Sequence, residues 1–320
     1  MDAVVGIDLG ATRVKAGVLR GGRVVAVRAD TLTVHDHTEV GIVERLVQVV
    51  RQLVADAGMP LESVRAVGIG APGAIRMTDG VVTLSPNFPE WHEFPLAARL
   101  AERLCLPVLM DNDANVVTLG EATYGAGAGV GDFVCFTLGS GVGSGLFIAG
   151  DIYRGKDGMA GELGHLTVEP EGFPCNCGNR GCLEQYASSA GLRNMVRRDR
   201  LFGDMTDAAL EDPDLPRRLY EAAMNGDARC QGYFEEFGYR LAIAVSAVLH
   251  TFNVHVIVLQ GGLARAMPAF MPKLQAELKG RGYPAIITPA RIVPCKLWEE
   301  AGVIGAAALA QRLGSTKKAI

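Results

Sequence analysis

The sequence predicts an α/β protein with two domains, and three observations lead to this prediction. Residues 3–19 read as two apolar strands joined by a polar, glycine-containing tip, and residues 132–148 repeat this design. Between the two repeats, a short apolar strand at 107–110 runs directly into the segment DNDAN at 111–115. Segments with helical periodicity alternate with the strands, which is the pattern of a layered α/β fold.

The composition limits the classes of protein to which the chain can belong. The 320 residues suffice for one large domain or two ordinary ones, and 49% hydrophobic with 21% charged residues is a globular profile. The formal net charge of −4 gives no electrostatic footprint for nucleic acid. No apolar run reaches the roughly 18 residues that a membrane span requires. We therefore expect neither a nucleic-acid partner nor a membrane partner.

The cysteines and the N-terminus predict a cellular location. The chain has seven cysteines, an odd number, and three of them are clustered with a histidine while four lie singly in mostly apolar surroundings. Metal ligands together with buried thiols are typical of a reducing compartment, not of a disulfide framework. The N-terminus enters an apolar strand at once, and no basic segment leads into a signal-like core. The predicted location is the cytoplasm.

The remaining elements follow from the same reading of periodicity and turn signals. The first half of the chain is expected to contain a strand at 23–28, a helix at 39–58, a strand at 64–70, a proline-rich loop at 85–91 and a helix at 96–104. The second half is expected to be mostly helical over 190–248 with a break at 211–214, and to contain a long helix at 232–250, a strand at 254–262, a helix at 263–279 and a helix of small residues at 299–313.

The step from strand to helix at 108–124 is a candidate for the chemical centre. Its strand part is apolar and its helix part begins near Asn112 or Asp113, so one of these residues is expected at the N-cap. Capping alone would explain one Asp or Asn but does not need the whole cluster. In open α/β sheets, ligands bind at the carboxyl ends of the strands. We therefore favour a catalytic carboxylate here over a capping role alone.

The two glycine-rich tips are candidate phosphate sites. A plain β-hairpin would explain the first tip, but it holds Asp8 inside an apolar strand and the small residues Gly10-Ala11-Thr12, whose N–H groups can cradle phosphate oxygens. The second tip, 139–145, lacks the Lys of a Walker A loop, and a strand instead of a helix follows it. Together the two tips suggest a duplicated fold that grips a polyphosphate from both sides.

The segment 163–185 predicts a metal site. It brings one histidine and three cysteines within eighteen residues, and these types are the ligands of a tetrahedral zinc ion: His165, Cys175, Cys177 and Cys182. Gly178 and Gly181 are expected to supply the sharp turns between the cysteines. Because all four ligands come from the protein, no coordination position stays open, and the predicted role of zinc is structural.

Two glutamates border this metal segment, and a pair of glycines ends a later strand. Glu162 and Glu184 would be aimed from a rigid loop, which suits a polyhydroxylated ligand, although solvated surface acids are the simpler alternative. Gly261-Gly262 would let a flat ring approach the backbone closely, and an ordinary strand-to-helix turn is an equal alternative.

Taken together, these motifs resemble the ROK family of sugar kinases and sugar-responsive repressors. The resemblance covers nearly the whole chain and is carried by the segments 6–13, 112–115, 138–145, 162–165, 175–184 and 300–307. It implies the actin-like, ribonuclease-H-like ATPase fold, with a cleft between two domains and a zinc-bearing loop. The expected division is a small domain formed by 1–116 plus 300–320 and a large domain formed by 117–299.

The resemblance also implies roles for single residues. Asp113 would be the general base for the 6-hydroxyl of a hexose, and the sugar would be held by Gly73, Asn87, Asn112, Asp113, Glu162, His165 and Glu184. The ATP phosphates would lie on Gly10, Ala11, Thr12, Arg13, Gly139, Ser140, Gly141 and Gly143. The adenosine would lie on Gly261 and Gly262, and Asp8 would help to position Mg²⁺. His165 would act twice, with one ring nitrogen on zinc and the other on the sugar.

The sequence departs from the family pattern at the first tip and leaves several alternatives open. Family kinases usually have Gly-Gly-Thr-Lys where this chain has Gly10-Ala11-Thr12-Arg13, and Ser140 and Ser144 replace a common Thr and Gly. We expect activity to survive, with glucose as the first choice of substrate. Other hexoses, a polyphosphate donor and a non-catalytic sugar-sensing protein remain alternatives. A repressor is disfavoured because the first tip begins near Val4, with no room ahead for a winged helix. A homodimer or homotetramer is expected.

Overall fold

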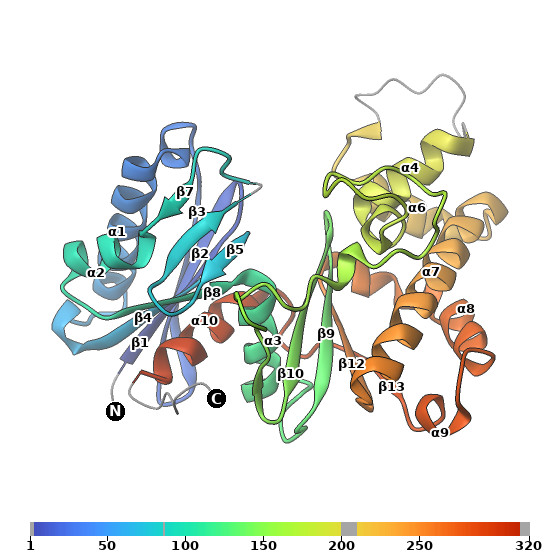
Figure 1. Cartoon of the computed structure of the whole chain (residues 1–320). Helices are drawn as coiled ribbons and strands as arrows, with labels where there is room; N and C mark the ends of the chain where they lie inside the picture. The colour runs from blue at the N-terminus through green and yellow to red at the C-terminus, as the bar shows by residue number, and fades with distance from the viewer. Residues whose placement is uncertain (1–2, 86, 200–209, 314–320) are drawn as a thin grey trace. The chain divides into compact units, whose positions relative to one another are not determined.

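The structure is a computed structural model that describes residues 3–85, 87–199 and 210–313 (Figure 1). The chain divides into two compact units. The first consists of Met1–Gly131, Gly145–Ala160 and Lys296–Ile320, and the second of Asp132–Ser144 and Gly161–Cys295. The sequence-based division, which ended the small domain at residue 116, stays a prediction.

The first unit is built on a mixed five-stranded sheet. Its order is β3-β2-β1-β4-β8, with β1 (Ala3–Leu9), β2 (Arg13–Arg20), β3 (Arg23–Thr31), β4 (Val64–Ala71) and β8 (Val108–Asn112). The strands β1, β2 and β3 pair antiparallel, whereas β1, β4 and β8 pair parallel. Because β4 and β8 are parallel to β1, their carboxyl ends lie at one edge, together with the tip that follows β1.

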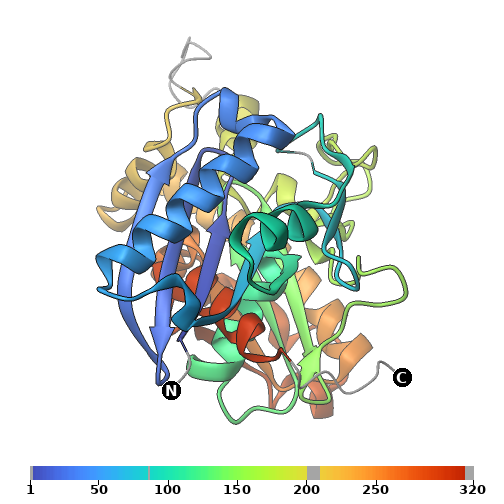
Figure 2. The same cartoon turned by 90° about the vertical axis from the view of Figure 1, so that its left-hand side faces the viewer.

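Alternate residues of the strands face two different helix layers. Val5, Ile7 and Leu9 of β1 belong to a large core cluster that also holds the apolar residues of α1 (Glu39–Asp56) and α2 (Leu96–Leu104). Figure 2 looks onto this face, with α1 as the long blue helix in front of the sheet. The side chain of Thr38 caps α1 by accepting the N–H of Gly41 at 3.0 Å.

The opposite face of the sheet carries α10 (Ala301–Gln311), which packs on β1 and β4 and on α3 (Asp113–Tyr124). The helix is rich in alanine and glycine, and its residues from Ala301 to Ala310 are all buried. Its backbone lies so close to its neighbours that a Cβ atom at Gly68 would overlap the carbonyl of Ala306, and one at Gly305 would overlap the carbonyl of Val116. The small residues predicted for this tail therefore serve close backbone packing.

A buried glutamate fixes the places where the chain leaves and re-enters the first unit. Glu121 of α3 is fully buried, and its carboxylate accepts the N–H of Ala126 at 2.7 Å. The same carboxylate accepts the N–H groups of Lys296 at 3.1 Å and Leu297 at 2.8 Å. Backbone N–H donors thus stabilise the buried carboxylate of Glu121. Without such partners, burying an ion costs on the order of several kcal/mol of folding free energy.

A second five-stranded sheet has the order β11-β10-β9-β12-β13. Its strands are β9 (Phe133–Leu138), β10 (Val142–Ile148), β11 (Asp151–Ile152), β12 (Val256–Gln260) and β13 (Arg291–Pro294). The boundary between the units falls within β10, and β12 pairs parallel with both β9 and β13. A small antiparallel sheet in the first unit joins β5 (Ala74–Arg76), β6 (Val81–Leu84) and β7 (His92–Phe94).

Among the described residues of the second unit, the α-helices are α4 (Ser189–Asp199), α6 (Leu215–Met224), α7 (Ala228–Phe252), α8 (Met267–Lys279) and α9 (Pro284–Ile287). The longest, α7, begins at the cap Asp227, whose carboxylate accepts the N–H groups of Arg229 and Cys230. Within the described ranges, no helix combines the length and the apolar character that crossing a bilayer requires.

The predicted mixed α/β class and most predicted elements are confirmed. The helices expected at 39–58 and 96–104 are α1 and α2, and the tail helix is α10. Part of the helical segment expected at 190–248 lies outside the described residues. The sequence analysis missed β5–β7, β11 and β13, which are strands of two to four residues and too short to show an alternating pattern.

We expect Gly305→Ala to destabilise the protein, because its methyl group would overlap helix backbone that cannot rotate away. Overpacking of this kind costs about 1–3 kcal/mol, and backbone overlap belongs at the upper end. The measurement is chemical denaturation. Gly232→Ala is the matched control, since a Cβ there meets nothing within 4 Å and the helix α7 should become slightly more stable. Equal stability of the two variants would contradict the packing argument.

Candidate functional site

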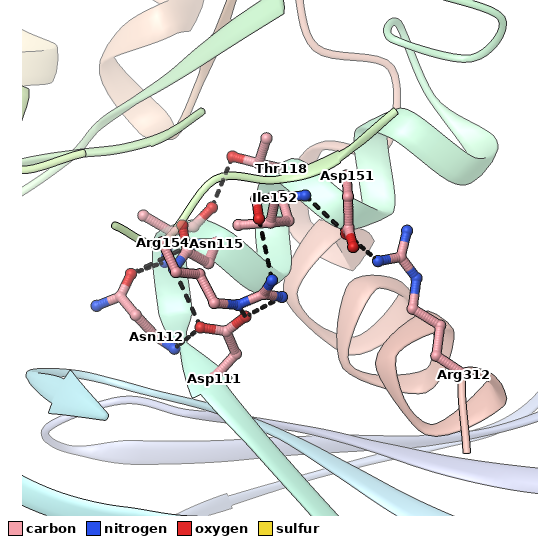
Figure 3. Close-up of polar contacts among 9 residues, drawn as sticks. Asp111, Asn112, Asn115, Thr118, Asp151, Ile152, Arg154 and Arg312 are labelled. Carbon is pink, nitrogen blue, oxygen red and sulfur yellow. Dashed lines mark hydrogen bonds and ion pairs between the residues drawn. The ribbon is translucent and has the colours of Figure 1, made fainter. Parts of the chain in front are cut away.

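The first part of the site is the junction between β8 and α3. The Oδ1 atom of Asn112 accepts the N–H of Ala114 at 2.9 Å and that of Asn115 at 3.3 Å, so Asn112 is the N-cap (Figure 3). Asp113 is therefore the first residue of the helix, and its Oδ1 atom accepts the N–H of Ala114 at 2.8 Å. The junction thus places a carboxylate at a helix N-terminus and at the carboxyl end of a parallel strand.

A second strand end is fixed to this junction. The Nδ2 atom of Asn112 donates to the carbonyl of Gly73 at 3.2 Å, just beyond the end of β4. Gly73 has φ +110°, and a Cβ there would overlap the backbone of Leu84 and Ser85, so only glycine fits. Gly73, Asn112 and Asp113 are thus brought together as expected. Asn87 lies exposed in the turn after β6, and its predicted role stays a prediction.

The first glycine-containing tip joins β1 to β2. The N–H of Gly10 donates to the carbonyl of Arg13 at 2.9 Å, which closes a tight turn with Thr12 and Arg13 exposed. Asp8 points from β1 to the same face as α10, where a Cβ on Gly302 would overlap its carboxylate. Gly302 therefore leaves room for the Asp8 side chain beside the first turn of α10.

The environment of Asp8 disfavours its charge. Burial raises the pKa of the Asp8 carboxyl, and the positive charge of Lys15 lowers it only in part. The Lys15 ammonium itself donates to the carbonyl of Glu299 at 2.7 Å. A half-buried carboxylate of raised pKa that sits beside a phosphate-type loop is a candidate partner for a cation.

The second glycine-rich tip, 139–144, lies in the second unit and is held by its neighbours. The N–H groups of Ser189 and Ala190, at the start of α4, donate to the carbonyls of Gly139 at 2.9 Å and Ser140 at 3.3 Å. From the other side, Oε2 of Glu184 accepts the N–H of Val142 at 3.0 Å. Glu184 is therefore in contact with the tip as well as with the metal segment, a link that sequence spacing did not indicate.

Ser144 links this tip to the segment that carries the other predicted acid. Its hydroxyl donates to the carbonyl of Gly161, and its oxygen accepts the N–H of Leu163 at 3.1 Å. The exposed Glu162 lies between these two contacts, and the carbonyl of Glu162 accepts the N–H of His165 at 3.1 Å. The sequence pattern marks Ser144 only as a departure from the family, whereas in the structure its hydroxyl orders the segment of Glu162 and His165.

The predicted metal ligands come together. One potential ligand atom from each of His165, Cys175, Cys177 and Cys182 lies within 4.8 Å of the other three. The Sγ atoms of Cys177 and Cys182 are 3.7 Å apart, and Cys175 Sγ lies 3.6 Å from Nδ1 of His165. Tetrahedral bonds of about 2.3 Å require ligand separations of about 3.8 Å, so the four groups fit one metal ion. The Nδ1 atom of His165 faces the cluster.

The loop that carries these ligands is also braced without a metal. Gly178 and Gly181 have φ +91° and +65°, which confirms the predicted turns. Burial, followed by the adjacent sulfurs of Cys175 and Cys177, raises the pKa of the Cys182 thiol to about 12. The pKa of the Cys177 thiol is lowered instead, mainly because it accepts the N–H of Asn179. Crowded sulfurs of this kind resist sharing negative charge unless a cation is present.

A brace on α7, which sequence reasoning missed, supports the same loop. The guanidinium of Arg240 stacks on Tyr186 at 4.8 Å, pairs with Glu169 at 2.7 Å and donates to the carbonyl of Val168 at 3.3 Å. The hydroxyl of Tyr186 in turn accepts the N–H of Phe173 at 3.2 Å. No sequence signal could have indicated this contact, because Arg240 lies 72 residues from Val168.

The paired glycines after β12 differ in their surroundings. Gly261 has φ +96°, and a Cβ there would overlap the backbone of Leu138 at the end of β9. Gly262 is exposed, with open space around it. Gly261 therefore serves close backbone packing, and Gly262 leaves open space just beyond the carboxyl end of β12.

Comparison with known proteins identifies the family. The model of the ROK family matches residues 4–313. The chain belongs to the ROK family. This ROK protein is 34% identical to a glucokinase of Thermotoga maritima, over 97% of this chain and 98% of the relative. It is also 29% identical to a xylose repressor of Caldicellulosiruptor bescii, over 96% of this chain and 77% of the repressor.

A solved relative confirms the predicted actin-like ATPase fold. The crystal structure of a ROK family glucokinase from Streptomyces griseus, in complex with glucose and AMPPNP, is 30% identical to this ROK protein. Its TM-score is 0.79, with 97% of this chain and 99% of that chain covered.

We expect Asp8→Asn to raise the unfolding midpoint of this ROK protein at pH 7. The pKa of Asp8 is raised in the folded state, so its contribution to stability is fully present below the unfolded pKa of about 4 and is lost as the pH rises through the folded value. The advantage of the variant should therefore shrink as the pH falls to about 4. Thermal unfolding between these pH values is the measurement.

Asp36→Asn gives the opposite sign and serves as control. Burial would raise the pKa of Asp36, but the N–H of Thr33 and the Arg45 guanidinium outweigh it and lower the pKa. Its neutral variant should therefore lose stability at pH 7. A lower unfolding midpoint for Asp8→Asn than for the wild type at pH 7 would contradict the claim that the buried charge of Asp8 destabilises the folded protein.

Proposed function

We propose that this protein is an ATP-dependent hexose kinase that transfers the γ-phosphoryl group to the 6-hydroxyl of glucose. The observation that carries the proposal is the junction at Asn112 and Asp113. A carboxylate stands there at the first turn of α3, next to the amide that caps this helix and binds the end of β4. The 34% identity to a glucokinase over nearly the full chain supports the choice of reaction and of glucose.

In the proposed reaction Asp113 is the general base. As the hexose O6 forms its bond to the γ-phosphorus, the bond from that phosphorus to the oxygen shared with the β-phosphate breaks, and ADP leaves. The proton of the 6-hydroxyl passes to the Asp113 carboxylate, which the N-terminus of α3 favours in its ionised form. Phosphoryl transfer of this type needs positioning and charge stabilisation more than covalent work by the protein.

Each unit, taken by itself, contains residues proposed to bind the sugar. Asn112, with the backbone at Gly73, belongs to the first unit, and Glu162, His165 and Glu184 belong to the second. Carboxylates accept sugar hydroxyl protons, and the second ring nitrogen of His165 can reach a hydroxyl while Nδ1 faces the cluster. Asn87 and Asp113 complete the proposed set.

The nucleotide would be held mainly by backbone. The N–H groups of the tips at 10–13 and 139–143 suit phosphate oxygens, and Gly261-Gly262 suits the adenosine. Mg²⁺ supplies charge neutralisation of the transferred phosphoryl group, and Asp8 is the residue proposed to hold it through water. Arg13 at the first tip offers a planar fork toward phosphate where a lysine would offer a point charge.

Zinc is the metal proposed for the cluster of His165, Cys175, Cys177 and Cys182. Three thiolates and one imidazole match its preferences, and four protein ligands leave no open position. Its proposed role is to fix the loop between Glu162 and Glu184. The predicted homodimer or homotetramer and the cytoplasmic location remain predictions.

A sugar-sensing protein without catalysis is the second candidate, favoured by the similarity to the xylose repressor. Both candidates bind sugar, so binding cannot separate them. Turnover separates the two candidates, because only the kinase needs Asp113 as a base and the two glycine-rich tips to bind a nucleotide.

We expect glucose to give the highest rate when ADP formation is followed with ATP and Mg²⁺ over a panel of glucose, fructose, mannose, and N-acetylated and amino hexoses. Asp113→Asn should lower kcat by about 10²–10⁴-fold, because the hydroxyl proton loses its acceptor. Its Kd for glucose, from calorimetry, should change little. Polyphosphate in place of ATP tests the alternative donor.

The matched control is Asp56→Asn, an exposed acid of the first unit that should keep the wild-type kcat. Near-normal turnover by Asp113→Asn would refute the base assignment. Glucose binding by the wild type without turnover of any hexose would favour the sugar-sensing protein.

We expect one zinc ion per chain in the purified protein, measured by elemental analysis. Cys177→Ser should lose the metal, lower the unfolding midpoint and weaken glucose binding, because the loop bearing Glu162 and Glu184 loses its fixed point. Cys105→Ser, an exposed cysteine outside the cluster, should retain the zinc and the glucose affinity. Absence of zinc from the wild type would overturn the metal assignment.

A further inference from the structure

We propose that the ion pair between Asp111 and Arg154 is a positioning device for phosphoryl transfer, which sets the orientation of the proposed base Asp113. This proposal rests on the proposed function. Asp111 does not reach the reacting atoms by itself; it acts through the backbone and side chains that it holds at the junction.

The Asp111 carboxylate connects three parts of the first unit. Its side chain is 3% exposed, and its Oδ1 atom accepts the N–H of Asn112 at 2.8 Å and the Nδ2 amide of Asn115 at 3.0 Å. Its Oδ2 atom accepts Nε of Arg154 at 2.8 Å and lies 2.7 Å from Nη2 (Figure 3). Both oxygens are therefore used twice, and every donor belongs to the junction or to Arg154.

Arg154 is fixed as firmly as its partner. Its side chain is 17% exposed, and its Nη1 atom donates to the carbonyl of Ile152 at 3.0 Å. All three guanidinium nitrogens thus have an acceptor. A lysine has a single nitrogen and could not replace these three contacts. The segment is held from a second side, because Asp151 pairs with Arg312 and accepts the N–H of Ile152 at 2.7 Å. Glu162, a proposed sugar ligand, lies eight residues after Arg154 in the chain.

The position of this pair points to function more than to stability. A buried ion pair gives little net stability compared with apolar residues of the same size, because both charges lose water. The atoms that Asp111 holds are the N–H of the capping residue Asn112 and the amide of Asn115, on either side of Asp113. A shift of about 1 Å at a reacting group can cost roughly 10²-fold in rate. Holding a residue on each side of the base, Asn112 and Asn115, keeps the base in place, which is what this chemistry requires.

The same unit contains a matched pair that does not touch the junction. Asp36, with a side chain 4% exposed, pairs with Arg45 at 3.2 Å and accepts the N–H and hydroxyl of Thr33 at 2.7 Å. Burial, partner type and number of hydrogen bonds are therefore comparable. Its variants report what the loss of a buried ion pair does to stability alone.

The experiment compares Asp111→Asn, Arg154→Met and their double variant with Asp36→Asn and Arg45→Met in the full-length protein. We expect each variant of the first pair to lower kcat by about 10²-fold with little change in the Kd for glucose. The double variant should lose no more than either single one, because both remove the same device. The variants of the control pair should lower the unfolding midpoint and keep the wild-type kcat.

Three further outcomes decide the proposal. A wild-type kcat in Asp111→Asn, together with a midpoint as low as that of Asp36→Asn, would overturn it. If Asp111→Asn does not fold, Arg154→Lys decides, because it keeps the charge and loses the fork: a reduced kcat at unchanged glucose affinity supports the positioning role, and an unchanged kcat contradicts it.

The third outcome separates this proposal from the proposed function. If the wild type phosphorylates no hexose, the proposed function fails, and amide hydrogen exchange then tests the positioning claim. Faster exchange at 112–118 in Asp111→Asn, but not in Asp36→Asn, supports it. Equal exchange in both variants contradicts it.

Discussion

The close approach of α10 to β1, β4 and α3 is the constraint on which the first unit depends. Glycines at the contact points let backbone lie against backbone, so α10 fixes the sheet and α3 in one arrangement. Two functional features follow from it. Gly302 of α10 leaves room for the Asp8 carboxylate, and α3 carries Asp113 at its start and the buried Glu121 near its end. The proposed base and the proposed cation-binding acid thus stand on elements that one helix holds in place.

The second unit uses a different device, a loop ordered by polar contacts. The contacts of Ser144, Glu184 and Arg240 join the glycine-rich tip, the glutamates and the metal-ligand cluster into one assembly. A metal ion added to this assembly would fix the loop further without carrying its fold alone. In the proposed function, Glu184 would couple sugar binding to phosphate binding in this unit, because its carboxylate accepts the N–H of Val142 in the second tip.

Local patterns in the sequence predicted much of this structure. The N-cap at Asn112 or Asp113, the turns at Gly178 and Gly181, and the ligand cluster depend on neighbours within about one loop, where spacing carries geometric information. The structure decides the first of these in favour of Asn112. The pairs that sequence reasoning missed are tertiary. Arg154 lies 43 residues from Asp111, and Lys296 lies 175 residues from Glu121. Nothing in the composition around either acid indicates its partner, because a buried carboxylate is recognised only once burial is known.

The central proposal is that the protein transfers the γ-phosphoryl group of ATP to the 6-hydroxyl of glucose. The most direct measurement is nuclear magnetic resonance of the product formed from glucose and ATP, with phosphorus coupling read at each carbon. The account predicts phosphate on O6 alone, together with binding but no phosphorylation of 6-deoxyglucose. Phosphate on another hydroxyl, or transfer to 6-deoxyglucose at a rate like that of glucose, would contradict it.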